Sequence, residues 1–231
     1  MLRHLLNSHP EIRCHGEVMA ATGLASFVAS EDDLEETRRL RERLSSEEPR
    51  RFLEEFVFAA NGARAVGFKV KYEELVREPF FWLLDWLRSH PEVRVVRMRR
   101  ENALKRYISQ VLSTKVYGVY NIVREEERPA PRRIRLTPEE CLADFRQLED
   151  REALFGEYFR GHSAVSTTYE SLLADREGTL RDVVGFLGLD AAPLATPTLK
   201  LNPDDLRDLI ENLDELAIAF RDTPYARYFP G

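Results

Sequence analysis

The sequence of 231 residues predicts an α/β protein in which a parallel sheet of few strands is surrounded by helices. Short runs rich in β-branched residues occur at 65–70, 93–98 and 164–168, and each precedes a segment whose apolar residues repeat at helical spacing. Strands that alternate with helices are typical of parallel sheets. Because this length suffices for one hydrophobic core and no repeat divides the chain, we expect a single domain over residues 1–231.

The composition narrows the class of protein and its partners. Charged residues make up 32% of the chain and hydrophobic residues 43%, which is ordinary for a globular protein and argues against disorder. A net charge of −6 does not favour nucleic-acid binding. No apolar run approaches the roughly 20 residues of a transmembrane helix, and no signal peptide is recognisable, so we expect a cytoplasmic protein. Cys14 and Cys141 lack metal-ligand spacing, which predicts free thiols and no metal site.

The N-terminal quarter is predicted to be mostly helical. Residues 1–8 have the pattern of the end of a helix, which stops at His9-Pro10. Residues 11–29 are expected to be mostly irregular, and Ser30 is a candidate N-cap for a helix that runs to about residue 44. Apolar residues over 52–60 again repeat at helical spacing.

The centre of the chain contains a strand that feeds a helix. Pro79 is predicted to open the helix that follows the 65–70 strand. A second helix is predicted to begin within two or three residues of the end of the 93–98 strand. The latter helix carries one apolar stripe, formed by Leu104, Ile108 and Val111. Its opposite side holds Asn102, Lys105 or Arg106, and Ser109, so one face packs while the other is free to contact a ligand.

Arg99 and Arg100 lie where that strand ends. The carboxyl end of a strand that leads into a helix is where α/β proteins bind ligands, and helix N-termini favour anions. The pair therefore indicates a phosphate-binding site, although two solvated arginines in a turn would have the same sequence.

The last part of the chain begins with a long loop. Residues 116–136 are charged and contain two prolines, which is typical of a lid or a substrate-binding loop. The sequence Thr137-Pro138-Glu139-Glu140 predicts the start of a helix, because it offers an N-cap, a proline in the first turn and a glutamate three positions after the cap. This helix is expected to run to about residue 159.

The C-terminal segments complete the pattern. The strand over 164–168 is followed by a helix that ends at Gly188, and a linker with Pro193 and Pro197 comes next. Asn202-Pro203 is predicted to cap one or two short helices through residue 220.

Four stretches in this order resemble one family. They are residues 5–17, which contain Leu-Asn-Ser-His-Pro and His-Gly-Glu, residues 67–70, residues 93–109, and residues 168–172 together with 186–189. This set resembles the sulfotransferases that use 3′-phosphoadenosine 5′-phosphosulfate, especially the bacterial branch that modifies carbohydrates and lipids. More distantly, it is similar to tyrosylprotein sulfotransferases. The resemblance implies a P-loop-type sheet, a small-molecule nucleotide donor of sulfate, and no metal.

The resemblance also implies roles for particular residues. In the family an arginine at a strand end and a serine about two helical turns later hold the 3′-phosphate. Arg99 and Arg100 are both candidates for the arginine, because the spacing from Arg100 to Ser109 is one residue longer than in many relatives. Tyr169 matches a tyrosine that lies against the nucleotide, and Lys200 stands where relatives place basic residues near it.

A general base must remove the proton of the acceptor hydroxyl. Glu17 matches the acidic residue to which this role is assigned in relatives, whereas His9 and His15 are expected to be structural. By resemblance the acceptor is a carbohydrate or a glycolipid. We expect residues 18–60 and 116–136 to select it.

One departure from the family pattern concerns the N-terminus. Relatives begin with a strand and a glycine-rich loop whose N–H groups hold the 5′-phosphosulfate. Met1 falls after that loop, so we expect a truncated chain whose sheet lacks its central first strand and whose activity is impaired. The alternatives are another P-loop phosphotransferase, such as a small-molecule kinase, and a non-catalytic remnant or interaction module.

Overall fold

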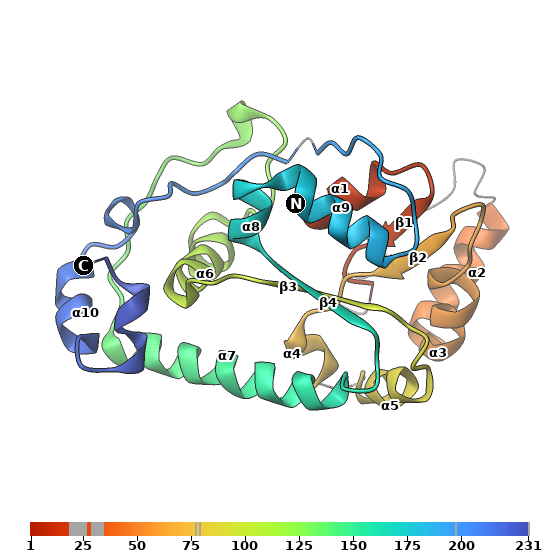
Figure 1. Cartoon of the computed structure of the whole chain (residues 1–231), viewed down its shortest axis with the longest axis horizontal. Coiled ribbons are helices and arrows are strands. Elements are labelled where there is room, and N and C mark those ends of the chain that lie inside the picture. The colour runs from red at the N-terminus through yellow and green to blue at the C-terminus, as the bar shows by residue number, and fades with distance from the viewer. Residues whose placement is uncertain (19–26, 29–34, 77, 79, 197, 231) are drawn as a thin grey trace. The chain divides into compact units, whose positions relative to one another are not determined.

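The computed structural model describes residues 1–18, 27–28, 35–76, 78, 80–196 and 198–230 (Figure 1). Ser30, Pro79 and Pro197, for which the sequence predicted local roles, lie outside these residues. The chain forms two compact units. Unit 1 comprises Met1–Val96, Tyr158–Val165 and Asp175–Thr196, and unit 2 comprises Arg97–Glu157, Ser166–Ala174 and Pro197–Gly231.

Unit 1 contains a two-stranded parallel sheet. Strand β1 (Ile12–His15) pairs with β2 (Ala65–Phe68), so that Ile12 stands opposite Ala65 and His15 opposite Phe68. Helix α1 (Leu2–Asn7) and helix α9 (Arg176–Phe186) lie beside this sheet (Figure 1). An apolar layer joins them, formed by Leu6, Ile12, Val183, Val184 and Leu189.

Local signals fix both ends of α9. The Asp175 side chain accepts a hydrogen bond from the backbone N–H of Gly178 at 2.9 Å and so caps the first turn. At the other end Gly188 has φ of +79°, the left-handed conformation that terminates helices most easily when the residue is glycine. The predicted end at Gly188 is thus confirmed.

The other helices of unit 1 follow one another along the chain. They are α2 (Glu35–Glu47), α3 (Pro49–Phe52), α4 (Tyr72–Leu75) and α5 (Phe81–Ser89). Helix α3 continues into a π-helical segment, η2 (Leu53–Val57), and together they account for the helix predicted over 52–60. Phe52, Leu53 and Val57 are buried, which explains why their spacing signalled this segment.

The prediction that residues 11–29 are mostly irregular was wrong for β1. This strand has only four residues, and only its first is a β-branched apolar residue. It is defined by pairing with β2, more than fifty residues later, and such a long-range pairing leaves only a weak local signal.

A second two-stranded sheet consists of β3 (Val95–Arg99) and β4 (Ala164–Thr168). Both strands were predicted, the second with its observed bounds. The expected α/β class, with helices around small parallel sheets, is confirmed, although the sequence predicted one sheet and the structure has two. The four strands found among the described residues form two separate pairs.

Unit 2 is built mainly from helices. Its elements are α6 (Ala103–Val111), the π-helical η3 (Leu112–Tyr117), η4 (Glu125–Glu127), α7 (Pro138–Tyr158), α8 (Tyr169–Ala174), η5 (Leu206–Asp208), α10 (Leu213–Phe220) and η6 (Pro224–Tyr228). Phe145 of α7 is 1% exposed and packs against the rings of Tyr225 and Tyr228, both at 5.2 Å. Leu104, Ile108 and Val111 are buried, as their stripe predicted.

The start of α7 has the predicted capping box. The Glu140 N–H donates to the Thr137 hydroxyl at 3.2 Å, and the Thr137 N–H donates to the Glu140 carboxylate at 3.0 Å. Among the helices in the described ranges, none combines the length and the apolar character needed to cross a lipid bilayer.

Candidate functional site

Arg100 lies directly after β3 in unit 2, against the first residue of α8. Its guanidinium carbon is 4.2 Å from the centroid of the Tyr169 ring, within the range of a cation–π contact. Its Nη1 donates to the backbone carbonyl of Lys105 at 3.2 Å, and its Nε is 3.8 Å from a Glu170 carboxylate oxygen. Within the described residues the buried Nε has no hydrogen-bond acceptor. The guanidinium is therefore held in place while one of its N–H donors remains unused.

Arg99 and Arg100 have different surroundings although they are adjacent. Arg99 is the last residue of β3, and Arg100 is the first residue after it. Arg99 lies 3.7 Å from Glu152 of α7, and 46% of its side chain is exposed, against 22% for Arg100. The structure thus brings Arg100 together with Tyr169 and gives Arg99 a different partner.

Ser109 faces a residue that the sequence did not single out as a ligand. The Asn202 amide nitrogen donates to the Ser109 hydroxyl at 3.3 Å. The Asn202 amide oxygen is buried and has no hydrogen-bond partner in the described part of the chain. Asn202 was predicted to cap a helix, but Asp205 has that role, because its carboxylate accepts from the Arg207 N–H at 2.8 Å.

Positive charge gathers near these residues. Lys200 forms an ion pair with Asp204. The hydrogen bond from Lys200 lowers the pKa of Asp204, and the charges of Lys105 and Arg100 act in the same direction. Three cations of unit 2 therefore act on Asp204: Arg100, which follows β3, Lys105 of α6, and Lys200 before η5. Arg100, Ser109, Tyr169 and Lys200, the residues predicted to hold the nucleotide, all belong to this unit.

The loop over 116–136 is attached to unit 2 at several points. Ile122 forms an antiparallel bridge with Leu199, and Ile134 forms a parallel bridge with Ile210. Arg128 donates to the carbonyl of Leu201 at 3.1 Å, next to Lys200. Tyr120, two residues before the first of these points, is 63% exposed. The role of this loop as a lid or substrate loop stays a prediction.

Glu17 belongs to unit 1, where two lysines hold its carboxylate. Lys69 Nζ donates to one oxygen at 2.5 Å, and Lys71 Nζ lies 2.7 Å from the other. Partial burial acts to raise the pKa of Glu17, but the hydrogen bonds from the two lysines outweigh it and lower the pKa overall. Glu17 is thus ionised at neutral pH, with both oxygens engaged.

The register of the first sheet explains this cluster. His15 and Phe68 are paired at the carboxyl ends of β1 and β2, so the residues that follow them emerge side by side. Ligands bind at the carboxyl ends of parallel strands. Sequence reasoning found Glu17 but missed Lys69 and Lys71. The signal was the run Lys69-Val70-Lys71 at the end of the strand predicted over 65–70, in a chain with few lysines.

The two nearby histidines have structural surroundings. His15 is buried, stacks on Phe27 at 4.3 Å, and accepts a hydrogen bond at Nδ1 from the Val28 N–H at 2.9 Å. Burial, assisted by the charge of Arg13, lowers the pKa of His15 to about 4. His9 accepts from the Glu11 N–H at 3.1 Å. Among the described residues, no group of three His, Cys, Asp or Glu side chains is arranged to hold a metal ion.

The chain is similar to known proteins over almost its whole length. A model described as "Sulfotransferase family" matches residues 1–193. Nodulation protein H of Rhizobium meliloti (strain 1021) is 27% identical over 233 residues, which cover 99% of this chain and 89% of that protein. Among solved structures, a sulfotransferase from Alicyclobacillus acidocaldarius superposes with a TM-score of 0.48 at 15% identity, covering 95% of this chain and 85% of that one.

Proposed function

The chain belongs to the sulfotransferase family, and from this premise we propose the donor and the acceptor of the transferred group. The donor is 3′-phosphoadenosine 5′-phosphosulfate. The acceptor is a hydroxyl group of a carbohydrate or a glycolipid. The observation that carries the proposal is the arrangement of Arg100 over Tyr169 beside two further cations, Lys105 and Lys200.

The residues of unit 2 fit the 3′-phosphate of this donor. A phosphate needs several directed donors, and a guanidinium presents N–H groups in a fixed plane. Arg100 has a buried Nε without an acceptor among the described residues, and Ser109 contributes a hydroxyl group. Tyr169 provides a ring against which the nucleotide lies. When bound, the donor supplies the sulfuryl group that is transferred.

The residues of unit 1 fit the acceptor side of the reaction. An ionised carboxylate is required to accept the proton of a hydroxyl group, and Glu17 is ionised at neutral pH. To take that proton, Glu17 must release a hydrogen bond from Lys69 or Lys71. The released ammonium group then becomes a donor for negative charge that develops during transfer. Lys69 and Lys71 therefore join Glu17 in the proposed site.

Ligand binding by the whole chain tests the donor. Adenosine 3′,5′-bisphosphate should raise the melting temperature in a thermal-shift assay, whereas ATP at the same concentration should have a smaller effect. Stabilisation by ATP alone would favour a kinase. No response to either nucleotide would favour a non-catalytic protein.

A transfer assay then tests the acceptor. Donor labelled in its sulfuryl group should give labelled product with carbohydrate or glycolipid acceptors and none with a tyrosine-containing peptide. Labelling of the peptide alone would contradict the proposed acceptor class.

A further inference from the structure

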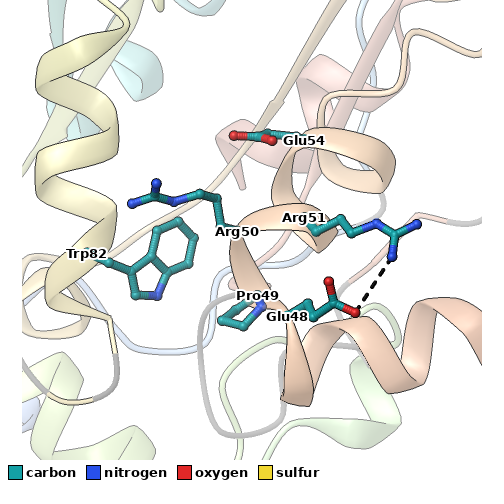
Figure 2. Close-up of a pocket in the computed structure, with 6 residues that line it drawn as sticks. All are labelled: Glu48, Pro49, Arg50, Arg51, Glu54 and Trp82. Atoms are coloured by element: carbon teal, nitrogen blue, oxygen red, sulfur yellow. Dashed lines mark ion pairs between the residues drawn. The ribbon is translucent and has the colours of Figure 1, made fainter.

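A cavity of about 350 Å³ in unit 1 takes no part in the chemistry described above (Figure 2). We propose that it binds one uncharged sugar ring of the acceptor. The inference rests on the proposed function, because it assigns a place to part of the proposed acceptor. The volume of the cavity lies at the lower end of the range for small-ligand pockets, about 300–1,000 Å³.

The wall of the cavity combines aromatic and charged side chains. Trp82 of α5 forms one side, and residues of α3 and its flanks form the other. Figure 2 shows Arg50 extending toward the indole ring of Trp82, whereas Arg51 extends away toward Glu48. The lining residues are Glu48, Pro49, Arg50, Arg51, Glu54 and Trp82.

The charges of the lining favour a neutral ligand. Two arginines and two glutamates sum to no net charge. An anionic ligand would meet the carboxylates of Glu48 and Glu54, and a cationic ligand would meet both guanidinium groups. A neutral sugar ring avoids repulsion from either set of charges, and its hydroxyl groups can donate to the carboxylates and accept from arginine. Its C–H face packs on an aromatic ring, as Trp82 offers here.

Two of the polar groups are available for such hydrogen bonds. In the described part of the chain the Arg50 guanidinium has no hydrogen bond or ion pair, and its carbon lies 5.9 Å from the Trp82 ring centroid. Glu54 uses Oε1 to accept from the Trp86 indole N–H at 2.8 Å, which leaves Oε2 for a ligand. Arg51 is engaged instead, with Glu55 at 2.6 Å and Glu48 at 3.6 Å.

Packed aromatic rings connect this cavity to the carboxyl end of β2. Phe68, which immediately precedes Lys69, contacts Phe58 at 5.8 Å between ring centroids. Phe58 stacks on Trp86 at 5.4 Å, and Trp86 holds Glu54. Glu54 and the strand end that carries Lys69 are therefore parts of one packed layer in unit 1. A sugar bound in the cavity is held by the same layer that positions Lys69.

Direct binding measurements test the inference without requiring turnover. The full chain is titrated with neutral tetrasaccharides of glucose, N-acetylglucosamine and mannose, and binding is followed by saturation-transfer NMR. Tryptophan fluorescence gives a second readout, because Trp82 and Trp86 are the two tryptophans of the sequence and Trp86 is only 6% exposed. We expect at least one probe to bind saturably.

Two variants and two matched controls locate the binding. Arg50→Ala and Trp82→Ala should each weaken sugar binding at least tenfold. Arg88→Ala is the control for the first, because Arg88 also lies over an aromatic ring, that of Tyr158 at 5.4 Å, but outside the cavity. Phe81→Ala is the control for the second, since Phe81 precedes Trp82 on α5 and is 47% exposed. Both controls should bind within twofold of the original chain.

The outcomes separate this inference from the proposed function. If no probe binds, or if Arg50→Ala and Trp82→Ala both bind as well as the controls, the cavity is not a sugar site. The affinity for adenosine 3′,5′-bisphosphate is measured on the same samples and should be equal in all of them. Sugar binding without bisphosphate binding would contradict the proposed donor and leave the sugar site standing.

Discussion

The guanidinium group of Arg100 and the ring of Tyr169 are stacked at 4.2 Å, although they follow two different strands, β3 and β4. The pairing of these strands brings the two side chains together. A cation over an aromatic face is held without using its N–H donors. Arg100 therefore combines a fixed position with a donor that is available for an anion.

Replacement of Arg100 by alanine should weaken the binding of adenosine 3′,5′-bisphosphate by roughly 1.5–3 kcal/mol, the contribution of a hydrogen bond to a charged group. Arg99→Ala is the matched control, because Arg99 lies beside Glu152 and its loss should change the affinity by less than about 0.5 kcal/mol. Isothermal titration at constant ionic strength gives both values. Equal losses in the two variants would exclude a specific role for Arg100.

Replacement of Glu17 by glutamine should lower kcat about 10²–10⁴-fold, the usual contribution of a general base. The affinity for the bisphosphate should not change, since Glu17 is not one of the proposed 3′-phosphate ligands. Rate measurements at saturating donor and acceptor separate the two effects. A kcat within threefold of the original would remove Glu17 from the chemistry.

The lysines around Glu17 should set the acidic limit of activity. Because Lys69 and Lys71 lower the pKa of Glu17, the carboxylate stays ionised as the pH falls through the ordinary range of glutamate. In Lys71→Met one of these hydrogen bonds is lost, the pKa of Glu17 rises, and the acidic limb of the kcat profile should move to higher pH. An unchanged limb would show that another group controls it.

Protonation of His15 should destabilise the fold in acid. Its pKa is about 4 in the folded chain and about 6.5 when unfolded, so the unfolded state binds more protons as the pH falls below 6.5. Relative to His15→Gln, the chain should lose about 2–3 kcal/mol of unfolding free energy between pH 7.5 and pH 4.5. Urea unfolding of both proteins at the two pH values measures this difference. If the unfolding free energies of the original chain and of His15→Gln change equally with pH, the pKa of His15 is not lowered in the folded chain.

The two thiols should be nearly inert in the folded chain. Burial raises the pKa of Cys14 to about 11 and that of Cys141 to about 12, so very little thiolate is present at pH 8. Reaction with Ellman's reagent should be at least about 100-fold slower than in guanidinium chloride, because the thiolate is the reactive form. Cys14→Ser and Cys141→Ser identify each thiol. The fully buried Cys141 should react last.

Elements with local signals were predictable from the sequence. The capping box at Thr137 and the glycine at 188 each act within one helical turn, so the residues themselves determine where α7 begins and α9 ends. Strand β1 was missed because its pairing partner is distant in the sequence. Its alternation of Ile12 and Cys14, both packed in the apolar layer, was the available signal.

The candidate site was predictable in composition and less so in arrangement. Residue types at a strand end indicated a phosphate site, but the choice between Arg99 and Arg100 depends on which side chain contacts Tyr169 and which contacts Glu152. Lys69, Lys71 and Asn202 emerged only from the structure. The first two depend on the register of β1 and β2, and Asn202 reaches Ser109 across 93 residues of sequence.

The division of the chain into units also bears on how it folds. The chain passes from one unit to the other after Val96, Glu157, Val165, Ala174 and Thr196, so neither unit is a continuous segment that can be expressed alone. Trp82 and Trp86 both belong to unit 1, whereas most of α7 belongs to unit 2. Tryptophan fluorescence therefore reports the melting of unit 1, and far-UV circular dichroism reports both. With so many crossings we expect the two transitions to coincide, as they do in a cooperative two-state unfolding reaction.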